Sequence, residues 1–282
     1  MTRETRIPRL LSIAGSDSGG GAGIQADLKA FAACGVHGMT AITAVTAQNT
    51  VAVTDIQQVP PEMIIAQIRA VAGDIGVDAV KIGMLGDRRT IEAVARGLDE
   101  LPPGTPVVLD PVMVAESGAP LLGRDARSTM IQLLLPRATV ITPNVPEARA
   151  LADPGPAGPA GPGAGPGPGP GPDDDVASLA RALHALGPAV VVVTGGHREQ
   201  AIDTYFDGHQ VVEIAGPRHP GAAAHGSGCT HSSVLAARLA WGDTALQAAR
   251  VAKQLAAEAV RNGLSEIGAG AGPVDVIGIA RP

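Results

Sequence analysis

The stretch with the clearest capacity for chemistry is a glycine-rich turn near the end of the chain. Gly226, Ser227 and Gly228 precede Cys229, and residues 231–240 are mostly small or apolar without Pro or Gly, which predicts a helix. The first N–H groups of a helix lack internal partners and its dipole favours negative charge, so such a turn can cradle a phosphate. Cys229 would lie in the first helical turn, where the pKa of a thiol falls. The alternative is an ordinary turn that begins a helix around a small buried cysteine.

A second set of candidates lies where predicted strands end. Short apolar runs predict strands at 10–14, 38–47, 79–82, 106–109, 139–141 and 189–193. In open α/β sheets, ligands bind outside the carboxyl ends of the strands, so polar residues and glycines there predict a site. The residues at these ends are Gln48, Met84, Asp110, Asn144, Glu147 and Gly195.

Asn144 and Glu147 have a spacing that suits Mg²⁺, with Asp110 able to join them from a neighbouring strand end. Mg²⁺ keeps several waters and takes only one or two carboxylates from a protein. The alternative is a helix start with Asn144 as its N-cap, and the two interpretations are compatible. Together with the glycine-rich turn, a cation here would supply the positioning and charge neutralisation that phosphoryl transfer needs.

A glycine-rich loop at 15–23 follows the first predicted strand and precedes a helix predicted at 24–34. It lacks the Lys of a P-loop and the spacing of a dinucleotide fingerprint, so it is not a standard phosphate loop. It could still let a small ligand approach the backbone, with Asp27 projecting from the first helical turn. The alternative is that Asp27 only stabilises the helix N-terminus.

Histidines do not form a recognisable metal site. His225 and His231 lie six residues apart rather than the four that share a helix face, and His197 and His219 add no ligand spacing. We expect these histidines at the surface or in turns.

Strands alternate with helices predicted at 60–72, 90–101, 176–186 and 245–262, and an Asp-Gly turn predicts a hairpin of 204–206 with 211–214. This order predicts a doubly wound α/β sheet. Residues 153–175 are Pro, Gly and Ala followed by aspartates, a composition that cannot bury enough apolar area to order itself. We interpret 1–282 as a single domain interrupted by a disordered insertion at 153–175; a linker between two domains is the alternative.

Composition excludes several classes of protein. The chain of 282 residues has a net charge of −6 and 1% aromatic residues, which argues against a nucleic-acid partner. Two cysteines form no disulfide framework, and no apolar run reaches the length of a membrane span. We expect a cytoplasmic protein without a membrane partner.

Taken together, these stretches resemble the hydroxymethylpyrimidine/phosphomethylpyrimidine kinases of the ribokinase-like superfamily. The resemblance covers nearly the whole chain apart from the insertion, and its joint pattern is far more specific than any one motif. The matching stretches are 14–29 (AGSDSGGGAGIQADLK), 46–50 (TAQNT), 81–85 (KIGML), 109–113 (LDPVM), 142–148 (TPNVPEA), 195–197 (GGH) and 226–230 (GSGCT).

The resemblance implies a three-layer fold with a mostly parallel sheet between helices, and a homodimer. It implies two ATP-dependent steps of thiamine biosynthesis: phosphorylation of the CH₂OH of an aminopyrimidine, then of the monophosphate to the diphosphate. Cys229 would be the catalytic base beside an anion hole of Gly226, Ser227 and Gly228. The remaining roles that it implies are the aminopyrimidine site at Gln48, Asp27, Met84 and Gly15, the ATP site at Asn144, Thr194, Gly195, Gly196 and Lys253, and Mg²⁺ at Glu147 and Asp110.

The chain departs from the family's pattern at a few positions. Ser227 stands where Thr is usual, Thr194 where many members have Lys, and Asp275-Val276 where Asn-His is common. A pyridoxal kinase of the same superfamily and a non-catalytic aminopyrimidine sensor remain as alternatives. A sugar kinase fits less well, because sugar kinases carry an aspartate base where this chain has Cys229.

Overall fold

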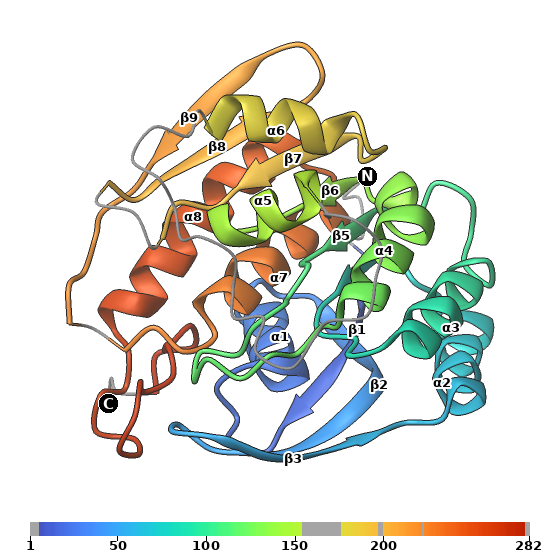
Figure 1. Cartoon of the computed structure of the whole chain (residues 1–282), viewed down its shortest axis with the longest axis horizontal. Helices are drawn as coiled ribbons and strands as arrows, with labels where there is room; N and C mark the ends of the chain where they lie inside the picture. The colour runs from blue at the N-terminus through green and yellow to red at the C-terminus, as the bar shows by residue number, and fades with distance from the viewer. Residues whose placement is uncertain (1–5, 154–175, 197–199, 222, 280–282) are drawn as a thin grey trace.

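One nine-stranded sheet organises the chain, in the order β3-β2-β1-β4-β5-β6-β7-β8-β9 (Figure 1). The computed structural model describes residues 6–153, 176–196, 200–221 and 223–279, so the predicted insertion, apart from Asp153, lies outside the described residues. The parallel strands are β1 (Arg9–Asp17), β2 (His37–Gln48), β4 (Ala79–Ile82), β5 (Val107–Leu109), β6 (Val140–Ile141) and β7 (Val190–Val193). The antiparallel strands lie toward the two edges and are β3 (Val53–Gln58), β8 (Ile202–Phe206) and β9 (Val211–Ala215).

Helices cover both faces of the sheet and enclose two apolar cores (Figure 1). Alternation along the strands divides the side chains between the cores; in β4, for example, Val80 and Ile82 belong to one core and Ala79 to the other. One face carries α1 (Gly23–Ala33), α7 (Ser227–Ala240) and α8 (Ala245–Arg261). The other carries α2 (Pro61–Asp74), α3 (Arg88–Leu98), α4 (Arg124–Leu133), α5 (Val145–Ala152) and α6 (Val176–His184). The predicted three-layer α/β fold is confirmed.

Most predicted elements are present, including the hairpin of β8 and β9, whose turn contains Gly208 with φ of 87°. Strand β3 and helix α4 were not predicted. The β3 side chains are mostly exposed because the strand lies at the edge of the sheet, so its sequence lacks an apolar run. Helix α4 buries only Ala126, Thr129 and Met130, too narrow a stripe to stand out in the sequence.

The order of the strands reverses at β1, because β2 and β3 lie on one side of it and β4 to β9 on the other. There a completely buried ion pair joins Lys81 of β4 to Asp27 of α1, with 2.8 Å between Nζ and Oδ1. The Asp27 carboxylate also accepts hydrogen bonds from the hydroxyls of Ser12 in β1 (2.6 Å) and Ser233 in α7 (2.7 Å). Because unpaired buried charges are costly, these contacts fix the helices against the sheet at its switch point.

Asp27→Leu should therefore destabilise the protein by about 3–5 kcal/mol, because Lys81 would remain buried without its counter-charge. The double variant Asp27→Leu/Lys81→Met removes both charges and should be more stable than Asp27→Leu alone. Urea unfolding measures both changes. As a control, Glu92→Ala breaks the exposed pair with Arg88 and should hardly change stability. The account would be contradicted if the double variant lost as much stability as the losses of Asp27→Leu and Lys81→Met added together.

Candidate active site

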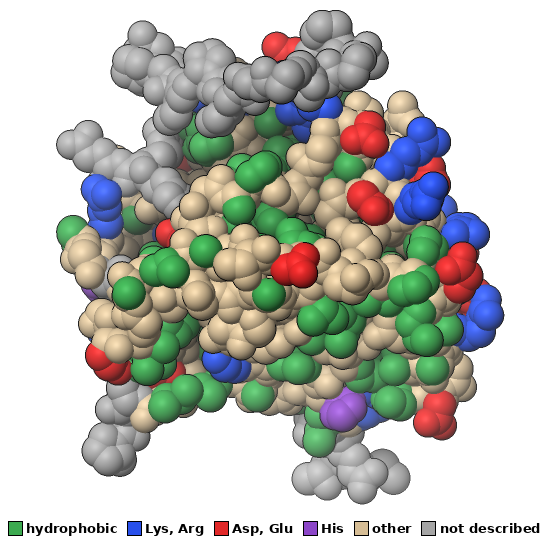
Figure 2. All heavy atoms as spheres, turned by 60° about the horizontal axis from the view of Figure 1, so that its bottom comes forward, with side chains coloured by type: hydrophobic (Ala, Val, Ile, Leu, Met, Phe, Trp, Pro, Cys, Tyr) green, Lys and Arg blue, Asp and Glu red, His purple; other side chains and the backbone are tan. Residues whose placement is uncertain are grey.

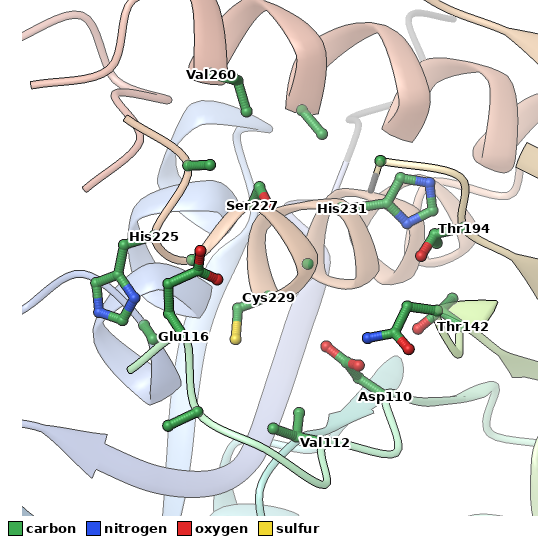
Figure 3. A pocket seen from close by; sticks show the side chains of 18 of the residues that line it. Asp110, Val112, Glu116, Thr142, Thr194, His225, Ser227, Cys229, His231 and Val260 are labelled. Atoms are coloured by element: carbon green, nitrogen blue, oxygen red, sulfur yellow. The ribbon is translucent and has the colours of Figure 1, made fainter. Parts of the chain in front are cut away.

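A cavity of about 420 Å³ opens at the carboxyl ends of the parallel strands, beside the N-terminus of α7 (Figure 3). This is the edge of the sheet at which the strand-end residues were predicted to meet. The predicted site residues that line it are Gly15, Gln48, Met84, Asp110, Asn144, Glu147, Thr194, Gly196, Gly226, Ser227, Gly228, Cys229 and Lys253.

The glycine-rich turn forms one end of the cavity. Gly226 is the N-cap of α7 with φ of 83°, a left-handed conformation that favours glycine. A Cβ there would lie 1.8 Å from the carbonyl oxygen of Gly21, so only glycine fits. The helix begins at Ser227, so Gly228 and Cys229, which line the cavity, lie in its first turn, where N–H groups lack partners within the helix; the Ser227 N–H itself donates to the Ala224 carbonyl (3.0 Å). The Cys229 sulfur points into the cavity, on the side where Val112 and Asp110 lie (Figure 3).

The ionisation of Cys229 differs from the sequence-based expectation. Burial, together with the negative charges of Asp110 and Asp27, raises the pKa of the thiol to about 12, against the opposing effects of Lys81 and of a hydrogen bond from the Gly23 N–H. The predicted fall in pKa at the helix N-terminus is therefore wrong for this protein without ligands. The helix dipole is outweighed because the thiol is desolvated between carboxylates that come from other elements.

Two carboxylates, Asp110 and Glu147, line the same cavity. Asp110 accepts a hydrogen bond from the hydroxyl of Ser232 (2.9 Å), and Glu147 accepts hydrogen bonds from the N–H groups of Asn144 (2.9 Å) and Met113 (3.3 Å). Burial and then the charge of Asp110 raise the pKa of Glu147 to about 8, and burial raises that of Asp110. Asn144 and Glu147 also form the capping box of α5, so the helix-start interpretation is confirmed.

The carboxylate pair fits a magnesium ion that is shared with a phosphate ligand. Two buried carboxylates that resist ionising together gain from a nearby cation. Among the described residues, no group of three or more His, Cys, Asp or Glu side chains could hold a metal by itself. Mg²⁺ commonly takes one or two carboxylates from a protein and completes its shell with phosphate and water.

The third part of the cavity combines an apolar wall with an amide. Met84 is 9% exposed, and its methyl group fills the space beside Gly15, where a Cβ would lie 2.7 Å from it. Gln48 lies at the end of β2, and its side-chain oxygen accepts a hydrogen bond from the hydroxyl of Thr46 (3.2 Å). A flat heterocycle with polar edge groups suits such a surface.

Several predicted site residues have other surroundings than expected. Asp27 is 0% exposed and does not line the cavity, because Lys81, Ser12 and Ser233 surround its carboxylate. The prediction that it contacts substrate is corrected accordingly. Gly195 also lies behind the surface: its N–H donates to Asp203 (2.9 Å). Lys253 lines the cavity, with its Nζ 2.7 Å from Asp203 Oδ1.

The histidine prediction is also wrong for two residues. His225 is 7% exposed with Nε2 3.1 Å from Asp17, and His231 is 5% exposed with Nε2 3.1 Å from Asp203. Both line the cavity, as does His219, which is half-buried, whereas His197 lies outside the described residues. The available signal was position: His225 and His231 flank the glycine-rich turn and Cys229.

Comparisons with known proteins agree with this geometry. The family model for phosphomethylpyrimidine kinase matches residues 17–275. The chain is 45% identical over 267 residues to the hydroxymethylpyrimidine/phosphomethylpyrimidine kinase of Rhizobium meliloti (94% of this chain, 95% of the relative) and 43% identical to that of Bacillus subtilis (95% and 94%). The pyridoxal kinase of Staphylococcus aureus in complex with ADP superposes with a TM-score of 0.83 at 31% identity (98% and 96%). Phosphomethylpyrimidine kinase from Clostridium difficile gives 0.70 at 36% identity (88% and 96%).

The fold and the site thus define a kinase of the ribokinase-like fold, a phosphotransferase. Within that class, the chain belongs to the phosphomethylpyrimidine kinase family. No helix in the described part of the chain is long and apolar enough to cross a membrane.

The raised pKa of Cys229 predicts a slow reaction with iodoacetamide, because only the thiolate reacts. In a Cys34→Ser background without ligands, the alkylation rate should rise steadily through pH 9 without a plateau, as expected for a pKa of about 12. Mass spectrometry of the quenched protein measures the rate, and a small-molecule thiol provides the control. A rate that levels off near pH 7 would show that the helix N-terminus stabilises the thiolate after all.

Proposed function

We propose that this protein transfers the γ-phosphoryl group of ATP first to the CH₂OH of a hydroxymethyl-aminopyrimidine and then to the resulting monophosphate, in thiamine biosynthesis. The observation that carries the proposal is the union, in one cavity, of Gln48 and Met84 with the Gly226–Cys229 turn and the Asp110–Glu147 pair. The relatives named above, with the same two activities in their names, support it.

In this proposal the pyrimidine lies against Met84, and the side chain of Gln48 hydrogen-bonds to the polar edge of the ring. A side-chain amide offers both a donor and an acceptor, which match the ring nitrogen and the exocyclic amine of an aminopyrimidine. The hydroxymethyl group then extends toward Cys229 and the first turn of α7. Gly15 leaves the apolar wall open because it adds no side chain next to Met84.

The two steps make different demands on the same groups. In both, the N–H groups of the α7 N-terminus bind the oxygens of the transferring phosphoryl group. In the first step the attacking alcohol loses its proton as the new P–O bond forms and ADP leaves, and Cys229 would accept that proton once its thiol, which burial keeps protonated in the protein without ligands, has ionised in the complex. In the second step the nucleophile is a phosphate oxygen that is already largely ionised at neutral pH, so no base is needed.

Asn144, Thr194, Gly196 and Lys253 would contact ATP, and Asp110 and Glu147 would hold Mg²⁺. When bound, the ion neutralises charge on the phosphates and on the two carboxylates. Asn144 is already fixed by the capping box of α5, so its side chain is held in place before any ligand arrives. Lys253 is oriented by its contact with Asp203.

We further propose that the enzyme is a cytoplasmic homodimer. Exposed apolar side chains support the dimer: Val45 of β2 is 50% exposed and Ile56 of β3 is 38% exposed. Figure 2 shows hydrophobic side chains spread over the face of the molecule that includes β3.

Pyridoxal is a second candidate substrate, because pyridoxal kinases are among the solved structures similar to this chain, with TM-scores of 0.82 and 0.83. Pyridoxal is also a flat heterocycle that carries a CH₂OH group. The same cavity could accept both rings, so the preference is decided by kcat/KM rather than by geometry.

The function is tested by mass spectrometry of the products formed from hydroxymethylpyrimidine and Mg-ATP, with pyridoxal in a parallel assay. We expect the monophosphate to appear first and the diphosphate later, at a higher kcat/KM than for pyridoxal. Phosphorylation of pyridoxal alone would overturn the proposal.

Gln48→Ala should weaken pyrimidine binding by about 1–3 kcal/mol, because buried polar groups lose a partner, and should leave ATP affinity nearly unchanged. Equal losses of affinity for the pyrimidine and for ATP would place Gln48 outside the pyrimidine site.

A further inference from the structure

Asp17 is a buried carboxylate whose contacts the reaction described above does not use. It is the last residue of β1, it is 3% exposed, and it accepts backbone hydrogen bonds from Gly19 (2.8 Å), Gly21 (3.0 Å) and Ala22 (2.8 Å). The fourth contact is His225 Nε2, 3.1 Å from Asp17 Oδ2. Burial alone would raise the pKa of Asp17, but the hydrogen bonds from His225, Ala22 and Gly19 outweigh it and hold the pKa below its ordinary value. Asp17 is therefore ionised, and His225 carries a hydrogen on Nε2 and donates it.

His225 is fixed on its other side by the segment near the end of the chain. Its N–H donates to the carbonyl of Gly272 (3.2 Å), and its own carbonyl accepts from Val274 (3.1 Å). Its ring lies against the backbone of Gly21, where a Cβ would come within 2.1 Å of Cδ2. His225 immediately precedes Gly226, so the residue that contacts Asp17 is also the residue that begins the anion-hole turn.

The loop that Asp17 organises reaches both parts of the reaction site. Gly23, at the end of the loop, lines the cavity together with Cys229, and its N–H favours the thiolate form of that residue. At the other end of the loop, the Ser18 hydroxyl donates to the carbonyl of Gln48 (2.7 Å) and accepts from its N–H (2.8 Å). The loop therefore connects the strand end that would bind the pyrimidine to the residue that would meet its hydroxyl group.

We propose that Asp17 and His225 are positioning residues that hold the Gly226–Cys229 turn at a fixed distance from the glycine-rich loop 17–23 and from Gln48, to which that loop is hydrogen-bonded. Neither residue touches the reacting atoms in this role. The pair joins segments 208 residues apart in the sequence, and the close backbone packing of Gly21 against Gly226 allows little variation in how they meet. Because misplacement of reacting groups by about 1 Å can cost on the order of 10²-fold in rate, this pair would act on kcat more than on binding. The inference rests on the proposed kinase function.

The test is steady-state kinetics of His225→Ala, His225→Gln and Asp17→Asn with the alcohol and with the monophosphate. His225→Ala should lower kcat by about 10–100-fold for both substrates while KM changes by less than about threefold, since the anion hole serves both steps. His225→Gln should restore most of the loss, because its amide N–H can still donate to Asp17. Exposed His37, at the opposite end of β2, provides the control: His37→Ala should leave both parameters unchanged.

The outcomes separate the possibilities. If the wild type phosphorylates neither pyrimidine, the proposed function fails. The positioning proposal is overturned if the wild type is active and His225→Ala keeps its kcat. It is also overturned if His225→Ala lowers only the thermal stability and the fraction of active molecules. Should His225→Ala fail to fold, Asp17→Asn decides: it keeps the volume of the side chain but loses the charge, and an unchanged kcat would overturn the proposal. The double variant Asp17→Asn/His225→Ala should be no slower than the worse single variant, because both changes break one contact.

Discussion

The buried ion pair between Lys81 and Asp27 is the interaction on which the architecture of the site depends. It lies where the sheet is wound in two directions from β1, and through Ser12 and Ser233 it ties β1, β4, α1 and α7 together. Replacing such a pair with apolar residues costs little in many proteins, so stability alone does not explain it. The position of the pair explains its presence, because Lys81 also lines the cavity and places a positive charge near Cys229.

The charges of the cavity follow from that arrangement. The charge of Asp110 opposes the ionisation of Glu147, and burial, together with the charges of Asp110 and Asp27, keeps the Cys229 thiol protonated in the protein without ligands. Lys81 and the Gly23 N–H favour the thiolate, but burial and the carboxylates outweigh them. A cation bound by the carboxylates would remove part of the opposing charge. In the proposed reaction the thiol would therefore ionise only in the complex, which would limit side reactions of a free thiolate.

Much of this structure follows from local sequence patterns. The apolar runs of β4 and β7 and the helix after the glycine-rich turn are local signals. The rule that ligands bind at the carboxyl ends of parallel strands predicted that Gln48, Asp110 and Glu147 would lie together, and all three line the cavity. What escaped depends on contacts distant in sequence. Asp27 was assigned to the substrate, since its partner Lys81 is 54 residues away and was not recognised. His225 was expected at the surface or in a turn, since its partner Asp17 is 208 residues away. The pKa of Cys229 was mispredicted for the same reason. The helix dipole follows from the local sequence, whereas Asp110 and Asp27 are distant in sequence.

The central claim is that one anion hole serves two nucleophiles while the thiol of Cys229 serves only the neutral one. The most direct measurement is the single-turnover rate for the alcohol and for the monophosphate, in the wild type and in Cys229→Ala. The backbone amides survive this change, so phosphorylation of the monophosphate should be nearly unaffected, whereas phosphorylation of the alcohol should slow by about 10²–10⁴-fold for loss of a base. Equal slowing of both steps would show that Cys229 shapes the turn instead, and no slowing of either would show that the thiol only fills space.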